Sequence, residues 1–162
     1  MHRCPLWAPL LGITPERVVC IDLLHTLHLG VMLGFVRHCL WVLLRSHVWG
    51  YLEATQEEGF RVAVAGLRAE LFGWYHDFNE EDVTRVADLV PSMLGSLSDP
   101  ILKAKGAETY GLLLFAISAL QRHAGKVGVQ GATLVAAGKY LHRYVVVCRV
   151  APVQPSPRQQ QD

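Results

Sequence analysis

Apolar side chains recur along much of the chain at spacings that are typical of helices. The clearest seam lies at residues 60–78, where apolar positions follow one another at intervals of four and three residues. Its members are Phe60, Val64, Leu67, Leu71, Trp74 and Phe78. Thr55 and Glu58 precede the seam as a T-x-x-E capping box, which is typical of a helix start. We therefore expect an amphipathic helix here, with Arg61, Arg68, Glu70 and Asp77 available for water.

The chain before this seam is more apolar still. From about Leu24 to Trp49 it is apolar nearly all round, which favours a buried helix over a surface helix. The short β-branched run "RVVCI" (17–21) is typical of a buried strand. Three prolines in residues 1–16 bar regular helix there, so we expect an extended N-terminal segment.

Turn and cap signals organise the chain after the seam. Residues 83–90 allow a short helix that ends near Pro91. Asp99 and Pro100 are typical of an N-cap and a first helical position, so a further helix is expected from there to about His123, with Gly106 as a point of interruption.

The C-terminal part divides into a turn, a last helix and a tail. "GKVGVQG" (125–131) predicts a turn, and a last helix should run through Tyr144. "YVVVCRV" (144–150) suits a strand equally well, and the proline- and glutamine-rich residues 151–162 are expected to be disordered. The whole pattern predicts a mainly α helical bundle with at most two or three short strands, as a single domain over residues 17–150.

Charge narrows the range of functions. The formal net charge of the 162-residue chain is +1, far from that of a dedicated nucleic-acid binder, so any DNA contact would come from a local patch. Lys139, Arg143 and Arg149, with Tyr140 and Tyr144, could line a phosphate-contacting face. A solvated helix face explains the same residues.

The cysteines and the apolar runs bear on the compartment. The chain has four cysteines, and no two of them form a C-x-x-C pair: Cys4, Cys20, Cys39 and Cys148. The N-terminus is broken by prolines and does not look secretory. We expect a reduced, intracellular protein. Polar residues interrupt the run 18–44, and the run 111–120 is half the length of a membrane span, so no transmembrane helix is expected.

One polar pattern interrupts the apolar chain. Residues 20–31 read "CIDLLHTLHLGV" and contain D-x-x-H-x-x-x-L-G-V. Asp22 could act as a helix N-cap, and His25 could be a hydrogen-bonded core residue. A zinc site made by Asp22, His25 and His28 is conceivable, although helical zinc pairs usually have the H-x-x-x-H spacing. About 80 residues later the chain reads "LKAKGAETYGLLLF" (102–115).

These two stretches resemble the second half of the catalytic core of transposases of the Plavaka and Kyakuja–Dileera–Zisupton type. The family motif D-x-M-H-x-x-x-L-G-V is matched except that Leu24 replaces the methionine. The later K-A-x-E-W-R motif is matched loosely by Lys105, Ala107 and Glu108, with Thr109 and Tyr110 in place of Trp-Arg. The resemblance covers roughly residues 17–120. It implies a partial RNase H-like core and a metal-dependent DDE enzyme that acts on DNA in the nucleus.

The resemblance assigns roles to single residues. Asp22 would be the second metal-binding aspartate and Glu108 the terminal glutamate, with His25 and Gly30 as supporting motif residues. Both carboxylates would hold Mg²⁺ or Mn²⁺, which take hard oxygen ligands. The family also needs an earlier aspartate, and Glu16 is the only acidic residue before Asp22.

We therefore expect a transposon-derived chain that is catalytically incomplete and has no strand-transfer activity. An alternative explanation of Glu108 needs no metal. An acidic residue in the first turns of a helix is stabilised by the helix dipole. The alternative function is a non-catalytic helical interaction module. In that case the apolar helices at 24–49 and 60–78 would be covered by a protein partner or by a missing upstream segment.

Overall fold

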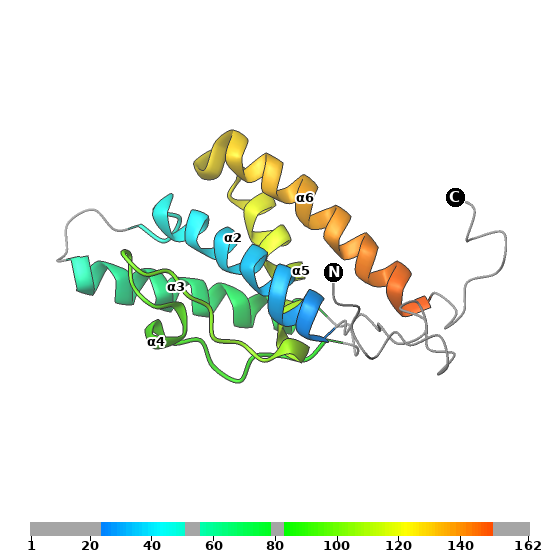
Figure 1. Cartoon of the computed structure of the whole chain (residues 1–162). Helices are drawn as coiled ribbons and strands as arrows, with labels where there is room; N and C mark the ends of the chain where they lie inside the picture. Colours follow the sequence, from blue (N-terminus) through cyan, green and yellow to red (C-terminus); the bar gives the residue numbers. More distant parts are fainter. Residues whose placement is uncertain (1–23, 51–55, 79–82, 151–162) are drawn as a thin grey trace, which may run out of the picture.

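The computed structural model describes residues 24–50, 56–78 and 83–150, and it consists mostly of helices (Figure 1). The elements are a π-helix, η3 (Leu24–Met32), and the α-helices α2 (Leu33–Arg45), α3 (Gln56–Asp77), α4 (Pro91–Leu94), α5 (Gly106–Arg122) and α6 (Ala124–Val150). In these ranges no strand forms, and the β-type pairing is one isolated antiparallel bridge between Gly95 and Pro100. The predicted mainly α fold is confirmed. The expected strand at 17–21 and both terminal segments lie outside the described residues.

The helix formed by η3 and α2 runs through the centre of the molecule, as its all-round apolar pattern predicts. It packs against α5 and α6, and α3 lies across from α6 (Figure 1). Seven of the thirteen residues of α2 are buried: Val36, Cys39, Leu40, Trp41, Val42, Leu43 and Leu44. Burying one such aliphatic side chain contributes about 1.5–3 kcal/mol, so α2 is the main element of the core.

This same helix bears on the question of a membrane. Among the described helices, the stretch His25–Arg45 is long and apolar enough to cross a bilayer by length and composition. Half of its most apolar window is buried inside the molecule, and the core helix of a folded domain meets the same criterion. The expectation that no helix spans a membrane stays a prediction.

The apolar seam of α3 faces the core, which confirms the expected amphipathic helix. Val64, Leu67, Leu71 and Trp74 are buried. At one end of the seam, Phe60 stacks on Trp41 of α2 with ring centroids 5.6 Å apart. At the other end, Trp74 meets Phe115 of α5 edge to face at 5.8 Å. The seam therefore joins α3 to α2 and to α5. Thr55 of the predicted capping box lies outside the described residues.

The prediction of a short helix at 83–90 is wrong. These residues form no helix and bend at Ala87, although Val83, Val86 and Leu89 are buried. The helix α4 begins at Pro91, whereas a helix end was expected there. Proline disfavours helical backbone in the residue before it, and Val90 is accordingly extended (φ −121°, ψ 156°). Pro91 therefore starts a helix at its first position, a role that proline fills as well as that of a terminator.

The predicted start of the next helix at Asp99-Pro100 is also wrong. Residues 101–105 are extended and pair with the chain around α4: the N–H of Ile101 donates to Leu94 O (2.9 Å), and that of Lys103 donates to Met93 O (2.8 Å). α5 begins only at Gly106 and ends at Arg122, close to the expected His123. Backbone pairing with residues 93–95 has thus replaced the helix that the local cap signal indicated.

Gly95 is required by this pairing. Its backbone is left-handed (φ 83°), and a Cβ there would collide with the carbonyl oxygen of Asp99 and lie 2.8 Å from Ile101 Cγ1. We expect Gly95→Ala to lower the free energy of unfolding by about 1–3 kcal/mol. Gly73→Ala in α3 is the matched control, since its Cβ would meet nothing within 4 Å. Urea denaturation that finds Gly95→Ala as stable as Gly73→Ala would contradict this.

The last helix is longer than predicted. α6 spans Ala124–Val150 with a break at Gly128 (φ 56°, ψ −146°), so the expected turn at 125–131 shrinks to His123 and this kink. Residues 144–150 are helical, which rules out the strand alternative. α6 packs closely on α5 because Gly138 faces Ile117: a Cβ on Gly138 would lie 2.7 Å from Ile117 Cγ1.

Candidate functional site

Glu108 lies in the first turn of α5 and caps it. The backbone N–H of Lys105 donates to Glu108 Oε2 at 2.8 Å, and the N–H of Glu108 donates back to Lys105 O at 2.9 Å. The lysine side chain has no oxygen for the second half of a capping box, so the glutamate alone satisfies this helix start. The residue is buried, with 8% of its surface exposed. The position agrees with the simple interpretation of Glu108 as an acidic residue that stabilises a helix start.

An open groove of about 510 Å³ lies beside Glu108. The groove is lined by Val86, Ala87, Asp88, Met93, Lys103, Ala104, Lys105 and Glu108. Asp88, which the sequence did not single out, bonds to Arg68 Nε at 2.6 Å, and this bond holds the pKa of Asp88 below its usual value. Of the two Glu108 oxygens, Oε2 accepts the bond from the Lys105 N–H.

The D-x-x-H-x-x-x-L-G-V motif continues into η3. Asp22 lies outside the described residues, and η3 begins two residues later at Leu24. π-helices are rare in proteins, and those that occur often lie at functional sites. A Cβ on Gly30 would lie 3.1 Å from the carbonyl oxygen of His25, so this glycine of the motif permits a close approach.

The two histidines of the motif differ in burial. The His25 side chain is exposed, whereas Nδ1 of His28 is buried and has no hydrogen-bond partner among the described residues. The described ranges also contain no group of three His, Cys, Asp or Glu side chains that could hold a metal ion. The zinc alternative thus gains no support from these two residues.

The helix η3, which contains His25 to Val31 of the first motif, contacts α5, which contains Glu108 of the second. η3 packs directly against α5, so the chain after Asp22 lies beside the helix that Glu108 starts. Next to Glu108, the Tyr110 hydroxyl shares a 3.1 Å hydrogen bond with His142 Nδ1 of α6. The guanidinium of Arg149 lies over the Tyr110 ring, 4.1 Å from its centroid. The start of α5 is therefore tied to the end of α6.

Two of the three cations predicted to contact phosphate, Lys139 and Arg143, share one face of α6, and Arg149 lies on another. Arg149 lies over the Tyr110 ring, and the side chains of all three cations are exposed. Arg149 lies about 120° around the helix from Arg143 at 3.6 residues per turn. Tyr140 and Tyr144 accompany Arg143, with 73% and 51% of their surfaces exposed. Lys139 and Arg143 keep the solvated positions that both interpretations of this face require.

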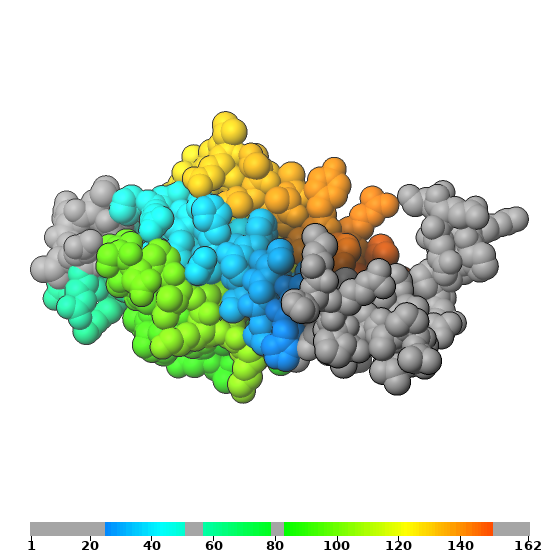
Figure 2. Space-filling view, in the orientation of Figure 1, coloured from blue at the N-terminus to red at the C-terminus, as the bar shows by residue number. Residues whose placement is uncertain are grey.

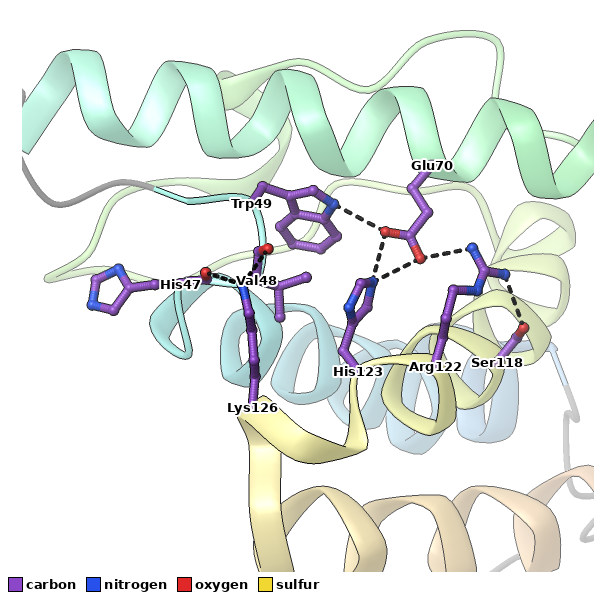
Figure 3. Close-up of polar contacts among 8 residues, drawn as sticks. All are labelled: His47, Val48, Trp49, Glu70, Ser118, Arg122, His123 and Lys126. Carbon is purple, nitrogen blue, oxygen red and sulfur yellow. Dashed lines mark hydrogen bonds and ion pairs between the residues drawn. The ribbon is translucent and has the colours of Figure 1, made fainter.

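A polar cluster that the sequence analysis missed joins four helical segments (Figure 3). The Glu70 carboxylate accepts a hydrogen bond from Trp49 Nε1 at 3.0 Å and from Arg122 Nη1 at 2.9 Å, and it lies 2.9 Å from His123 Nε2. Only 13% of the Glu70 side chain is exposed. Glu70 was expected to face water, so that expectation is wrong: the carboxylate links α3 to the end of α5 and to the turn after α2.

Lys126 completes this junction. Its Nζ donates to the carbonyl oxygens of His47 (3.1 Å) and Val48 (2.9 Å), which follow the end of α2 (Figure 3). The Glu70 carboxylate and the Lys126 ammonium thus both join separate segments of the chain, so we assign the cluster a structural role. No sequence signal marks it, because Glu70 lies 52 and 53 positions from Arg122 and His123.

The cysteines allow a simple chemical check of the core. Burial raises the pKa of the Cys39 thiol to about 12, and Cys148 is half-buried. Because the thiolate is the reactive form, Cys39 should resist alkylation at pH 8 until the protein unfolds. In a variant with Cys4 and Cys20 replaced by serine, mass spectrometry should find native labelling at Cys148 only. Equal labelling rates at both thiols would contradict the buried position of Cys39.

Comparison with known proteins adds no relative to this picture: no family model, no curated protein and no solved structure matches the chain.

Proposed function

We propose that this chain is a transposon-derived protein that corresponds to the second half of a DDE transposase core and does not cut or join DNA by itself. The observation that supports the proposal most is the packing of η3 against α5. η3 continues the motif that contains Asp22, and α5 carries Glu108 in its first turn. The two motifs are about 80 residues apart in the chain, and residues of η3 nevertheless pack against α5.

The metal implied by the resemblance is Mg²⁺ or Mn²⁺, and the residues that would hold it are Asp22 and Glu108. Glu108 fits this role in two respects: its oxygens are hard ligands, and it lines an open groove while Lys105 holds only one oxygen. In a complete enzyme such a metal activates the attacking oxygen and stabilises the leaving oxygen. Two carboxylates, without the first aspartate of the triad, would bind the ion but not assemble the reaction centre.

The loss of activity is tested directly with DNA. The purified chain, a labelled duplex end and millimolar Mn²⁺ should give no nicked or joined product. A metal-dependent product that Glu108→Gln abolishes would overturn the proposed loss of activity. Glu108→Gln is suited to this test, since its amide oxygen can still accept the Lys105 N–H bond and keep the helix cap.

A second candidate, a non-catalytic helical interaction module, is favoured by the outer face of α6. The apolar sides of the helices at 24–49 and 60–78 pack into the core, whereas α6 exposes large apolar side chains. Its most exposed members are Val129, Tyr140, Tyr144, Val147 and Val150, each with 51–85% of its surface exposed. Exposed apolar surface of this kind is typical of contact sites.

The melting temperature separates the two candidates. If Asp22 and Glu108 bind metal, Mn²⁺ at ten times its dissociation constant adds about 1.4 kcal/mol of stability, or about 3–6 °C. Asp22→Asn keeps the ability to cap a helix and should abolish the shift. If neither protein responds, both carboxylates are structural and the interaction module is favoured.

A further inference from the structure

The net charge of the chain conceals a strong separation of charges. Residues 24–50 and 109–150 contain no aspartate or glutamate. These residues form α2 and α6, which pack against each other, whereas the acidic residues of the helical chain gather on α3 and in the segment before α5. Figure 2 shows the α2 surface (blue to cyan) between α6 above and the green chain below. The helices α2 and α6 therefore carry cations and no carboxylate.

Of these two helices, α2 presents a single strip to solvent. The helix is buried on its other sides, and the exposed side chains of the strip are Arg37, His38 and Arg45. Gly34 leaves open space on the same strip, since a Cβ there would meet nothing within 4 Å. None of the large apolar residues that are exposed in the described chain belongs to α2. The strip thus offers cations and accessible backbone, without the apolar anchors that a membrane-surface helix needs.

These three cations line one small pocket. The pocket has a volume of about 230 Å³ and is lined by Arg37, His38, Trp41, Arg45 and Pro100. Pockets for whole small molecules usually measure about 300–1,000 Å³. A smaller, open, cationic pocket suits one anionic group that projects from a larger molecule.

Arg45 is held in place before any ligand arrives. Its guanidinium lies over the Trp41 ring, 5.4 Å from the centroid, and its Nη2 donates to Leu97 O at 3.3 Å. Arg37 and His38 make no ion pair with the described residues. An arginine fixed in this way presents its remaining donors in a geometry that matches a phosphate group.

We propose that the α2 pocket formed by Arg37, His38 and Arg45 binds a phosphate group of a nucleic-acid backbone. The site uses no residue of the D-x-x-H motif and does not include Glu108, so it stands or falls independently of the proposed transposase origin. Nucleic acid is favoured over a lipid surface because the strip lacks exposed large apolar side chains. Backbone contacts of this kind position a strand and do not read its sequence.

Fluorescence anisotropy with a labelled 20-base-pair DNA duplex tests the site, over salt concentrations from 50 to 200 mM. Removing one phosphate-binding cation should reduce the slope of log affinity against log salt by about one. We expect Arg37→Gln and Arg45→Gln each to lower affinity about tenfold at 50 mM salt and to reduce the slope in this way. Arg61→Gln is the matched control, because it removes the same charge from an exposed pair with Glu57 on α3.

Each outcome is informative. Weaker binding in the two α2 variants but not in Arg61→Gln supports the site, provided that circular dichroism shows all three proteins folded. Equal effects of all three substitutions would show that DNA binding depends only on the net charge of the protein. Unchanged affinity in the α2 variants would show that the pocket does not contact DNA. Binding to phosphatidylserine vesicles with no binding to DNA would overturn the choice of ligand. His38→Ala provides a further variant that leaves the Arg45–Trp41 contact in place.

Discussion

Trp41→Ala is expected to lower the free energy of unfolding by about 3–5 kcal/mol, the largest effect predicted for a single substitution in this chain. Trp41 is 2% exposed and stacks on Phe60, so it links α2 to α3. Its indole Nε1–H donates a hydrogen bond of 3.4 Å to the carbonyl oxygen of Ile101 at the edge of the core. Truncation would therefore leave a large cavity at the meeting point of three segments.

Urea denaturation followed by circular dichroism measures this effect. Trp41→Phe is the matched variant, since it keeps an aromatic ring against Phe60 and removes only the indole N–H and part of the volume; a loss of about 1–2 kcal/mol is expected. Val62→Ala, at an exposed site of α3, should change stability by less than about 0.5 kcal/mol. A decrease of less than about 1 kcal/mol in Trp41→Ala would show that α2 does not form the centre of the core.

Glu70→Ala should lower the free energy of unfolding by about 2–3 kcal/mol. The substitution removes the acceptor shared by Trp49, Arg122 and His123 and leaves their donors facing a largely enclosed space. Unsatisfied buried donors cost about 1–3 kcal/mol each when they cannot reach water, and the half-exposed Arg122 can reach it.

The control for Glu70 is another glutamate of α3. Glu57 pairs with Arg61, but 78% of the Glu57 side chain is exposed, so Glu57→Ala should cost less than about 0.5 kcal/mol. High salt should reduce the small Glu57 effect and leave the Glu70 effect largely unchanged. Equal effects of the two substitutions would mean that the Glu70 cluster does not join the helices.

The parts of the fold that the sequence predicts correctly are those where the hydrophobic pattern alone decides. The seam at 60–78 and the all-round apolar run from Leu24 describe α3 and the central helix well, since a one-sided seam fixes the buried face and an all-round apolar run favours a central position. Two predictions at prolines are wrong: that a helix ends near Pro91, and that a helix starts at Asp99-Pro100. Proline begins helices as readily as it follows them, and the pairing of residues 101–103 with 93–94 depends on long-range contacts that leave no local signal.

The candidate sites divide in the same way. The motif makes Glu108 a candidate site residue, which stays a prediction, and its place in the first turn of α5 follows once the helix is known to start at Gly106. Glu70 could not be found, because its partners lie outside α3 and its own position outside the apolar seam suggests solvent. The α2 pocket was hidden for a different reason: an apolar run with two arginines predicts burial, and only the packing of neighbours shows which strip stays exposed.

The most direct test of the central claim is a Mn²⁺ binding isotherm, with free Mn²⁺ measured by electron paramagnetic resonance. The proposed pair of carboxylates predicts one site per chain in the wild type, and it predicts that Asp22→Asn and Glu108→Gln each weaken binding by at least tenfold while Asp99→Asn does not. Asp99 is a suitable control because it is an exposed carboxylate outside both motifs. Absence of a site in the wild type, or equal binding in all four proteins, would contradict the claim that Asp22 and Glu108 are the remaining metal ligands of a transposase core.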